Sequence, residues 1–253
     1  MNGKKVVAII QARMGSRRFP GKVLAHLCGK PVLQHVIEAV RRAKTVHDVI
    51  VATAGPRHRE ISVLCSRLGV SCFCGAVELE ANVLGRFVRT LEAWPAELVV
   101  RVCADNPLIR PILINQLVQA AVKSGADYTG YRLPDGRPAI SQPNGYIAEV
   151  VKSKVLMCFD KRLVRYAASR AHVTAPIYHQ SSCHSLKWLN LPDHIYRLPP
   201  AAIDTLEDLE RVRAIIQSRE QIGNSLGKIL IEHGMCLADE QPLEVKLLQN
   251  REE

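Results

Sequence analysis

Residues 6–24 read VVAIIQARMGSRRFPGKVL, and this stretch decides which fold the sequence predicts. The unbroken apolar run at residues 6–10 is typical of a parallel strand that is buried on both faces. A loop with four cations follows, and its glycines, Gly15 and Gly21, permit backbone turns that other residues resist. Such a loop at the carboxyl end of a strand is suited to hold a polyphosphate with its N–H groups and cations. The alternative interpretation is a basic surface loop with glycines at its turns.

Downstream of this stretch, strand patterns alternate with helical patterns. Strands are expected at residues 46–53, 70–73 and 98–103, and helices at residues 31–40, 60–68, 82–93 and 111–123. This alternation predicts an α/β fold of the Rossmann-like type, with a mostly parallel sheet and helices on both faces. Ligands of such sheets bind beyond the carboxyl ends of the strands, so the polar segments that begin at Gln11, Thr53 and Asp105 are expected to meet in one crevice.

The second half of the sequence departs from this alternation. Residues 131–147 are rich in turn-forming Pro, Gly, Asp and Asn. They indicate a small β-rich insertion, which either covers the site or joins a second copy of the chain in a homodimer. A strand at residues 147–151, a helix with Ser153 as its candidate N-cap and a strand within residues 183–191 are expected next. We therefore expect one domain over residues 1–223, followed by a helical extension and a polar tail over residues 224–253.

The composition is that of a chain with a full apolar core, since 47% of its 253 residues are hydrophobic. No apolar run approaches the ~18 residues that a membrane span needs, and the first residues lack signal-peptide features. The eight cysteines include no C-x-x-C pair, which favours small buried side chains in a reducing cytoplasm. A metal site formed by Cys72, Cys74 and a distant residue is the alternative.

The net charge of +10 is concentrated near the start, because residues 1–60 hold 12 Lys and Arg but 3 Asp and Glu. A nucleic-acid partner would explain such an asymmetry. However, aromatic residues make up 5% of the chain and do not alternate with the basic ones, so base stacking is not supported. A small polyanion bound at the loop explains the charge equally well. We therefore expect no nucleic acid and no membrane among the partners.

The loop at residues 11–24 matches neither the P-loop pattern nor G-x-G-x-x-G. It resembles A-R-x-G-S-x-R-x-P-x-K, the signature of the cytidylyltransferases that activate acidic sugars, which include the acylneuraminate and CMP-Kdo synthetases. The run Q-A-R-M-G-S-x-R-x-P-G-K-V-L is most similar to the spore-coat polysaccharide branch of that family. The resemblance spans about residues 5–221 and implies a fold of the nucleotide-diphospho-sugar transferase type.

Two aspartates are candidate ligands of Mg²⁺. The segment Ala104-Asp105-Asn106-Pro107-Leu108-Ile109 resembles the metal-binding G-D-x-P-L-I of the family, and residues 204–209 resemble its late D-T-x-E-D-L. A hard cation that bridges phosphates requires oxygen ligands of this kind. Asp105 could instead open a turn before Pro107. Asp204 could instead cap the following helix, unless Thr205 takes that role.

The resemblance also assigns residues to the nucleotide. From the loop these are Gln11, Ala12, Arg13, Gly15, Ser16, Arg18 and Lys22. Thr53 follows the second strand, and the segment from Asn82 to Arg86 resembles the family's D-V-L-x-R. For Arg86, contact with the nucleotide and an ordinary solvated position on a helix are both open.

Three residues are candidates for binding the acceptor: Arg110, Arg132 and His172. His172-Val173-Thr174 resembles an H-V-T of this branch, although a lone His is often structural. Arg110 stands where the family usually has an acidic residue. Arginine can bind a phosphate group through two parallel hydrogen bonds, so this difference suggests an acceptor with more negative charge. An exposed arginine at the start of the helix is the alternative for Arg110.

Together these features predict a Mg²⁺-dependent cytidylyltransferase, with Arg13, Lys22 and Asp105 as catalytic residues. It would bind CTP and a small anionic acceptor, either an acidic sugar or a phosphate- or phosphonate-bearing molecule, and release pyrophosphate. The CMP-linked product would serve surface-glycan or related biosynthesis. One alternative is a nucleotidyltransferase of the same fold that uses another nucleoside triphosphate. The other is a basic protein that binds nucleotide or nucleic acid without catalysis.

Overall fold

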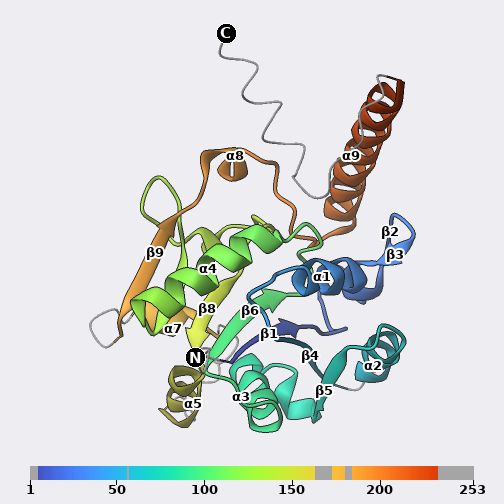
Figure 1. The fold of residues 1–253 in the computed structure, drawn as a ribbon. Helices are drawn as coiled ribbons and strands as arrows, with labels where there is room; N and C mark the ends of the chain where they lie inside the picture. Colours follow the sequence, from blue (N-terminus) through green and yellow to red (C-terminus); the bar gives the residue numbers. More distant parts are fainter. Residues whose placement is uncertain (1–4, 56, 163–172, 180–183, 233–253) are drawn as a thin grey trace. The chain divides into compact units, whose positions relative to one another are not determined.

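The computed structural model describes residues 5–55, 57–162, 173–179 and 184–232 (Figure 1). Within these residues, the central sheet has seven strands: β1 (Val6–Gln11), β4 (Asp48–Ala54), β5 (Ser71–Gly75), β6 (Leu98–Cys103), β7 (Tyr128–Arg132), β8 (Glu149–Lys152) and β9 (Leu186–Asn190). The helices are α1 (Val32–Arg41), α2 (His58–Arg67), α3 (Val83–Ala93), α4 (Pro111–Ser124), α5 (Ser153–Arg162), α7 (Ala175–His179), α8 (Asp193–Tyr196) and α9 (Leu206–Glu232). Short elements are the hairpin of β2 (His26–Leu27) and β3 (Lys30–Pro31) and the 3-10 turns η1 (Lys22–Leu24), η2 (Val77–Leu79) and η3 (Ala139–Ser141).

The strand order in the sheet is β5-β4-β1-β6-β8-β7-β9. β5, β4, β1 and β6 are parallel to one another, whereas β8 runs antiparallel to both β6 and β7. β9 lies at the edge, parallel to β7. The predicted Rossmann-like, mostly parallel sheet is therefore confirmed, and its first four strands and the helices α1 to α4 lie within two residues of the expected positions.

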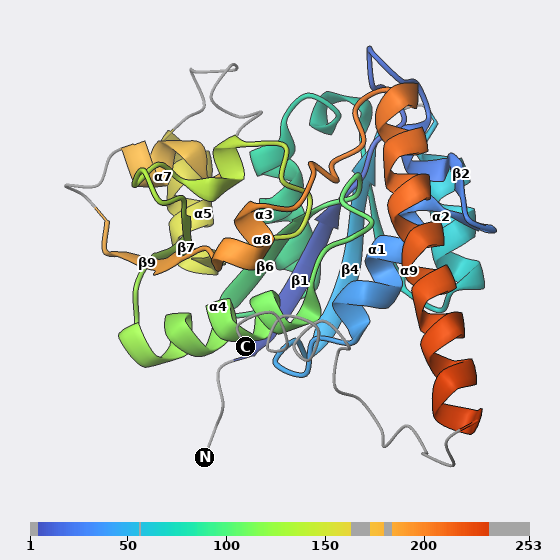
Figure 2. The ribbon, with the colours of Figure 1, turned by 90° about the horizontal axis from the view of Figure 1, so that it is seen from above.

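Helices cover both faces of the sheet, which explains why residues 6–10 of β1 are all apolar. Val7 and Ile9 belong to a buried cluster with Phe87 of α3 and Leu156 of α5. Because side chains alternate along a strand, the other apolar residues of β1 face the opposite layer. Figures 1 and 2 show α1 and α4 on that side of the sheet, with α3 and α5 on the other side.

β7 was not expected from the sequence, because its five residues include Gly130 and end in the exposed Arg132. Its partners are β8 and β9, which follow it in the chain at some distance. The insertion expected over residues 131–147 thus begins after Arg132. It contains η3 and an isolated bridge between Arg132 and Pro138.

The chain divides into two units, one that ends at Val212 and one that begins at Arg213. The sheet and its loops belong entirely to the first unit. In the second unit, the described residues 213–232 are helical and belong to α9. The boundary predicted near residue 223 therefore falls inside α9. No described helix combines the length and the apolar character that crossing a membrane requires.

Candidate active site

The loop between β1 and η1 folds back on a single carbonyl group. The carbonyl oxygen of Met14 accepts hydrogen bonds from the N–H groups of Ser16 and Gly21, both 3.0 Å long. Gly21 has a φ of 73°, a left-handed conformation that favours glycine. Ser16 Oγ accepts a further hydrogen bond of 3.4 Å from the N–H of Phe19. The loop is therefore stabilised by its own residues, and it leaves Lys22 at the start of η1.

Two further glycines of the site lie close to Glu80. A β-carbon built on Gly15 would lie 2.4 Å from Glu80 Oε1, and one built on Gly55 would lie 2.6 Å from Glu80 Oε2. The Glu80 carboxylate thus lies between the loop that follows β1 and the end of β4. Gly55 also has a φ of 95°, which favours glycine, whereas a side chain at Gly15 requires only that the flexible end of Glu80 shifts.

A cavity of about 540 Å³ opens at the carboxyl ends of β1 and β6. Ten of the residues that the sequence assigns to the site line it: Gln11, Ala12, Arg13, Gly15, Ser16, Arg18, Lys22, Arg86, Asp105 and Asp204. The rest of the lining consists of Arg17, Val23, Val83, Cys103 and Ala104. The structure therefore brings the basic loop and the two distant aspartates into one crevice.

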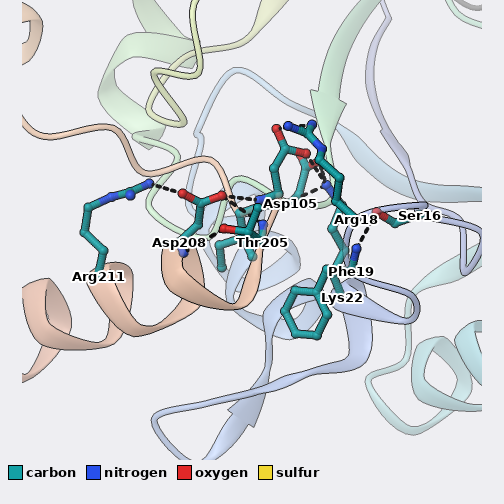
Figure 3. A network of polar contacts seen from close by, with 10 residues as sticks. Ser16, Arg18, Phe19, Lys22, Asp105, Thr205, Asp208 and Arg211 are labelled. Atoms are coloured by element: carbon teal, nitrogen blue, oxygen red, sulfur yellow. Dashed lines mark hydrogen bonds and ion pairs between the residues drawn. The ribbon is translucent and has the colours of Figure 1, made fainter.

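Lys22 is the centre of this cavity's polar network (Figure 3). Its Nζ lies 2.6 Å from Asp105 Oδ2, 2.8 Å from Asp204 Oδ1 and 2.7 Å from the carbonyl oxygen of Ile203. Arg18 also pairs with Asp204, at 2.8 Å between Nη2 and Oδ2. Burial lowers the pKa of Lys22, but the charges and hydrogen bonds of the two aspartates outweigh it, so the pKa lies above its ordinary value. Lys22 is therefore a charged, buried ammonium.

Asp204 is free for this role because other residues cap α9. Thr205 Oγ1 accepts a hydrogen bond from the N–H of Asp208, and Asp208 Oδ2 accepts from the N–H groups of Asp204 and Thr205. This is a reciprocal capping box in which Thr205 is the N-cap. Arg211 holds the other oxygen of Asp208 at 2.6 Å, as Figure 3 shows. The alternative that Asp204 itself caps the helix is therefore excluded.

The donor set around Lys22 has the chemistry that Mg²⁺ prefers, because both aspartates and the Ile203 carbonyl offer hard oxygen atoms. Among the described residues, no three His, Cys, Asp or Glu side chains are grouped so that they could hold a metal by themselves. A magnesium ion held by one or two carboxylates takes its remaining ligands from water and substrate phosphates. Two carboxylates beside a phosphate-binding loop fit that pattern.

Arg86 lies inside the protein rather than on a solvated helix face. It is 1% exposed, and its Nη1 donates a hydrogen bond of 3.2 Å to the carbonyl oxygen of Ala12. Burial and the charge of Arg13 lower the pKa of Arg86 to about 10, against the opposing effect of Glu80. A buried cation that lines the cavity and holds the end of β1 is suited to an anionic ligand.

A second polar network lies between the neighbouring strands, and it was not predicted from the sequence. Arg101 of β6 pairs with Glu149, which stands directly opposite it on the antiparallel β8. Glu149 is 1% exposed and accepts hydrogen bonds from Tyr128 Oη at 2.7 Å and from Thr174 Oγ1 at 2.9 Å. Arg101 Nε also donates to Gln11 Oε1 at 3.3 Å, which ties this network to the cavity. The sequence signal for this network was a single arginine within the otherwise apolar strand LVVRVC.

A smaller cavity of about 150 Å³ lies next to the first and shares Cys103 and Asp105 with it. Its other lining residues are Arg101, Asn106, Ile140, Gln142, Asn144, Gly145, Ile147 and Ala202. Five of its ten residues come from the loop between β7 and β8, which was expected either to cover the site or to join a second copy of the chain. Burial raises the pKa of the shared Cys103 thiol to about 11, so it stays protonated at neutral pH.

Several expected site residues do not line either cavity. Thr53 is fully buried within β4 and lines neither cavity, so its contact with the nucleotide stays a prediction. Asn82 is the N-cap of α3, and its Oδ1 accepts a hydrogen bond of 2.9 Å from the N–H of Gly85. Arg110 lies with its guanidinium carbon 5.8 Å from the centre of the Tyr146 ring. Arg132 lies 4.8 Å from the Trp188 ring and lines a separate hollow.

His172, the third expected acceptor residue, lies outside the described residues. Cys72 and Cys74 have their sulfur atoms 3.7 Å apart on β5. They belong to no metal-binding group of three within the described part of the chain, so the alternative of a cysteine metal site gains no support.

Comparison with known proteins places these features in a family. The family model described as cytidylyltransferase matches residues 7–185. The spore coat polysaccharide biosynthesis protein SpsF of Bacillus subtilis is 31% identical, over 84% of this chain and 86% of its own length. The 3-deoxy-manno-octulosonate cytidylyltransferase of Geobacter sulfurreducens is 28% identical, over 83% of this chain and 86% of its own length.

Among solved structures, a CMP:2-keto-3-deoxy-manno-octonic acid synthetase complexed with CTP has the same fold, with a TM-score of 0.67 and 20% identity. The match covers 85% of this chain and 99% of that one. The resemblance found in the basic loop and around the two aspartates is thus confirmed. The chain belongs to the cytidylyltransferase family.

Proposed function

We propose that this protein transfers CMP from CTP to an oxygen atom of an acidic sugar, with release of pyrophosphate, in a reaction that needs Mg²⁺. The observation that carries the proposal is the single cavity in which Asp105 and Asp204 meet the cations of the basic loop. A pure anion-binding protein has no use for two carboxylates beside its anion. The named activities of the relatives, which act on 3-deoxy-manno-octulosonate, agree with an acidic sugar as the acceptor.

In this proposal the triphosphate lies along the loop, where Arg13, Arg18 and the loop N–H groups neutralise its charge. Asp105 and Asp204 would hold Mg²⁺, and the ion, when bound, stabilises the charge that develops on the phosphate oxygens. Arg86 is fixed by the Ala12 carbonyl group and adds a cation that needs no reorganisation during the reaction. Phosphoryl-type transfer asks mainly for position and charge, so no separate general base is invoked.

The acceptor is proposed to bind in the smaller cavity, because that cavity shares Asp105 with the nucleotide cavity. An acceptor oxygen placed there would lie beside the metal-binding carboxylate. The lining cation is Arg101, which already pairs with Glu149, and the other polar side chains include the neutral amides Asn106, Gln142 and Asn144. A doubly charged phosphate would find little opposing charge in this lining. A sugar with one carboxylate and several hydroxyl groups suits it better than a phosphate or phosphonate.

The test is a matrix of pyrophosphate-release assays. Each of the four nucleoside triphosphates is combined with 3-deoxy-manno-octulosonate, N-acetylneuraminate, a sugar phosphate and a phosphonate, with and without Mg²⁺. We expect release with CTP and a sugar acid, and none without a divalent ion. Turnover with another triphosphate would replace CTP in the proposal. Turnover only with the phosphate or phosphonate would move the acceptor away from the smaller cavity.

A further inference from the structure

We propose that the Lys22 ammonium is an internal cation that closes the metal site in the ligand-free protein. A divalent ion would reach Asp105 and Asp204 only after Lys22 has moved off them. The inference rests on the proposed function in one respect, because it takes these two aspartates as the metal ligands.

The oxygen atoms around Lys22 Nζ satisfy all the donors of the ammonium group. An ammonium has three N–H donors and no acceptor. Lys22 Nζ lies 2.6, 2.8 and 2.7 Å from three oxygen atoms, which belong to Asp105, Asp204 and the carbonyl group of Ile203. Its hydrogen bonds are therefore complete without water. Mg²⁺ binds oxygen at 2.0–2.1 Å, so an ion that took these same oxygens would need the volume that Nζ fills.

The charge of Lys22 also opposes a divalent ion at the same place. Lys22 is 8% exposed, and its positive charge is offset by the two carboxylates. A divalent ion placed beside the ammonium would meet repulsion that buried surroundings do not screen as water does. Removing Lys22 without a replacement would leave Asp105 without its paired cation and Asp204 with Arg18 alone. If the divalent ion takes the place of the Lys22 ammonium, the two cations do not repel each other, and the carboxylates stay paired with a cation throughout.

The phosphates of a bound nucleotide would offer the Lys22 ammonium an alternative partner. Lys22 and the loop cations line the same cavity, and the long lysine stem can turn toward a phosphate group without moving the backbone. Phosphates that attract Lys22 would uncover the carboxylates for the ion. Nucleotide and metal would then each increase the affinity for the other, as linkage requires.

The test measures metal binding without nucleotide and without turnover. Mn²⁺ is the probe, and the free ion is followed by electron paramagnetic resonance while wild type, Lys22→Met and Lys30→Met are titrated. Lys30→Met is the matched control, because Lys30 pairs with Glu38 at the surface and the substitution removes one positive charge, as Lys22→Met does. We expect Lys22→Met to bind one Mn²⁺ at least tenfold more tightly than wild type, and Lys30→Met to behave as wild type. Lys22→Gln repeats the test should the methionine variant fail to fold.

A second pair of variants locates the ion. Adding Asp105→Asn to Lys22→Met should return Mn²⁺ binding to the wild-type level, whereas adding the exposed Asp135→Asn should not. If Lys22→Met and Lys22→Gln bind Mn²⁺ no more tightly than Lys30→Met, Lys22 does not close the site. That result would leave the proposed transfer of CMP standing. Conversely, tighter Mn²⁺ binding in a protein with no turnover of CTP would overturn the proposed function and keep the cation exchange.

Discussion

The two sides of the central sheet use polar residues in opposite ways. On the side formed by β5, β4, β1 and β6, every strand is parallel, and most polar residues that line the larger cavity lie in loops beyond the strand ends. On the side formed by β8, β7 and β9, one strand is reversed and the polar residues lie within the sheet, around Glu149. Charges at strand ends stay accessible to ligands, whereas Glu149, which lies between strands, is 1% exposed.

The two sides meet at Arg101. Its guanidinium pairs with Glu149 in the reversed strand and donates to Gln11, which lines the larger cavity. We infer that the β8 side stabilises the protein and positions the end of β1, while the β1 side performs the chemistry. Substitutions on the two sides should then be separable, with the first group changing stability and the second changing turnover.

The largest effect is expected on the β8 side, from Glu149→Gln. Glutamine keeps the size of the side chain but removes the charge that balances Arg101, and one uncompensated buried charge costs about 3–5 kcal/mol of unfolding free energy. For a domain of this size we expect the melting temperature to fall by about 6 °C or more, measured by calorimetry.

The matched control is Glu92→Gln, since Glu92 pairs with Arg89 on the surface with its side chain 50% exposed. Exposed pairs contribute about 0–1 kcal/mol, so the control should melt close to wild type. Equal melting temperatures for the two variants would show that the Arg101–Glu149 pair does not stabilise the sheet.

The next effect is expected on the β1 side, from Asp105→Asn. Loss of one charge-stabilising group should lower turnover of CTP about 10²–10³-fold, or about 2.7–4 kcal/mol of transition-state stabilisation. Asp204→Asn should behave in the same way, and the double variant should be little worse than either, because the two aspartates act as a unit. Rates are measured by pyrophosphate release, and circular dichroism checks the fold.

Asp135→Asn serves as the control, because Asp135 pairs with Arg137 in an exposed turn. It removes a carboxylate of the same kind from a residue that lines neither cavity, and its turnover should match wild type. Near-wild-type turnover by Asp105→Asn at low Mg²⁺ would remove this residue from the metal site and with it the division between the two sides.

How much the sequence predicts also differs between the two sides. The apolar run before Gln11 and the repeated strand–helix pattern are local signals, so the positions of the first four strands were predictable. Lys22 and Asp105 could be placed at strand ends for the same reason. That Asp105 meets Asp204 came only from the resemblance, because the two are far apart in the chain and no local pattern encodes their contact.

On the β8 side the deciding contacts depend on the register of non-local strands. Arg101 stands opposite Glu149 only because β8 runs antiparallel to β6, and nothing in either segment alone predicts that pairing. β7 was missed because its residues lack an apolar pattern. Thr53 shows a related dependence: the end of β4 was located correctly, but the side to which its hydroxyl group points depends on the pleat of the assembled sheet.

A smaller, pH-dependent effect is expected at the start of α9. Burial raises the pKa of Asp208, but hydrogen bonds from the Asp204 and Thr205 N–H groups and from Arg211 outweigh it and lower the pKa to about 2, from 3.8. A lowered folded-state pKa stabilises the protein above pH 3.8, and this contribution is lost as the pH falls toward 2. Asp208→Asn should therefore lose about 1 kcal/mol at neutral pH, as capping groups do, and the difference from wild type should shrink below pH 4.

Urea unfolding at a series of pH values measures this difference. Glu207→Gln is the control, since Glu207 is an exposed carboxylate in the same turn of the helix. It should follow wild type at every pH. A difference between Asp208→Asn and wild type that stays constant from pH 7 to pH 2 would mean that the charge of Asp208 does not support the capping box.

The smallest effect concerns Arg132, which the sequence assigned to the acceptor. Its guanidinium lies 4.8 Å from the centre of the Trp188 ring, and such a contact at an exposed site stabilises by about 0.5–1 kcal/mol. Arg132→Ala should lower the melting temperature by about 1–4 °C and leave the KM for the acceptor within about twofold of wild type. Arg137→Ala, in the exposed turn that follows β7, should leave both quantities unchanged. A tenfold rise in acceptor KM for Arg132→Ala alone, about 1.4 kcal/mol, would extend the acceptor site across β8 to β7. The β8 side would then bind substrate as well as stabilise the protein, and the separation between the two sides of the sheet would not hold at Arg132.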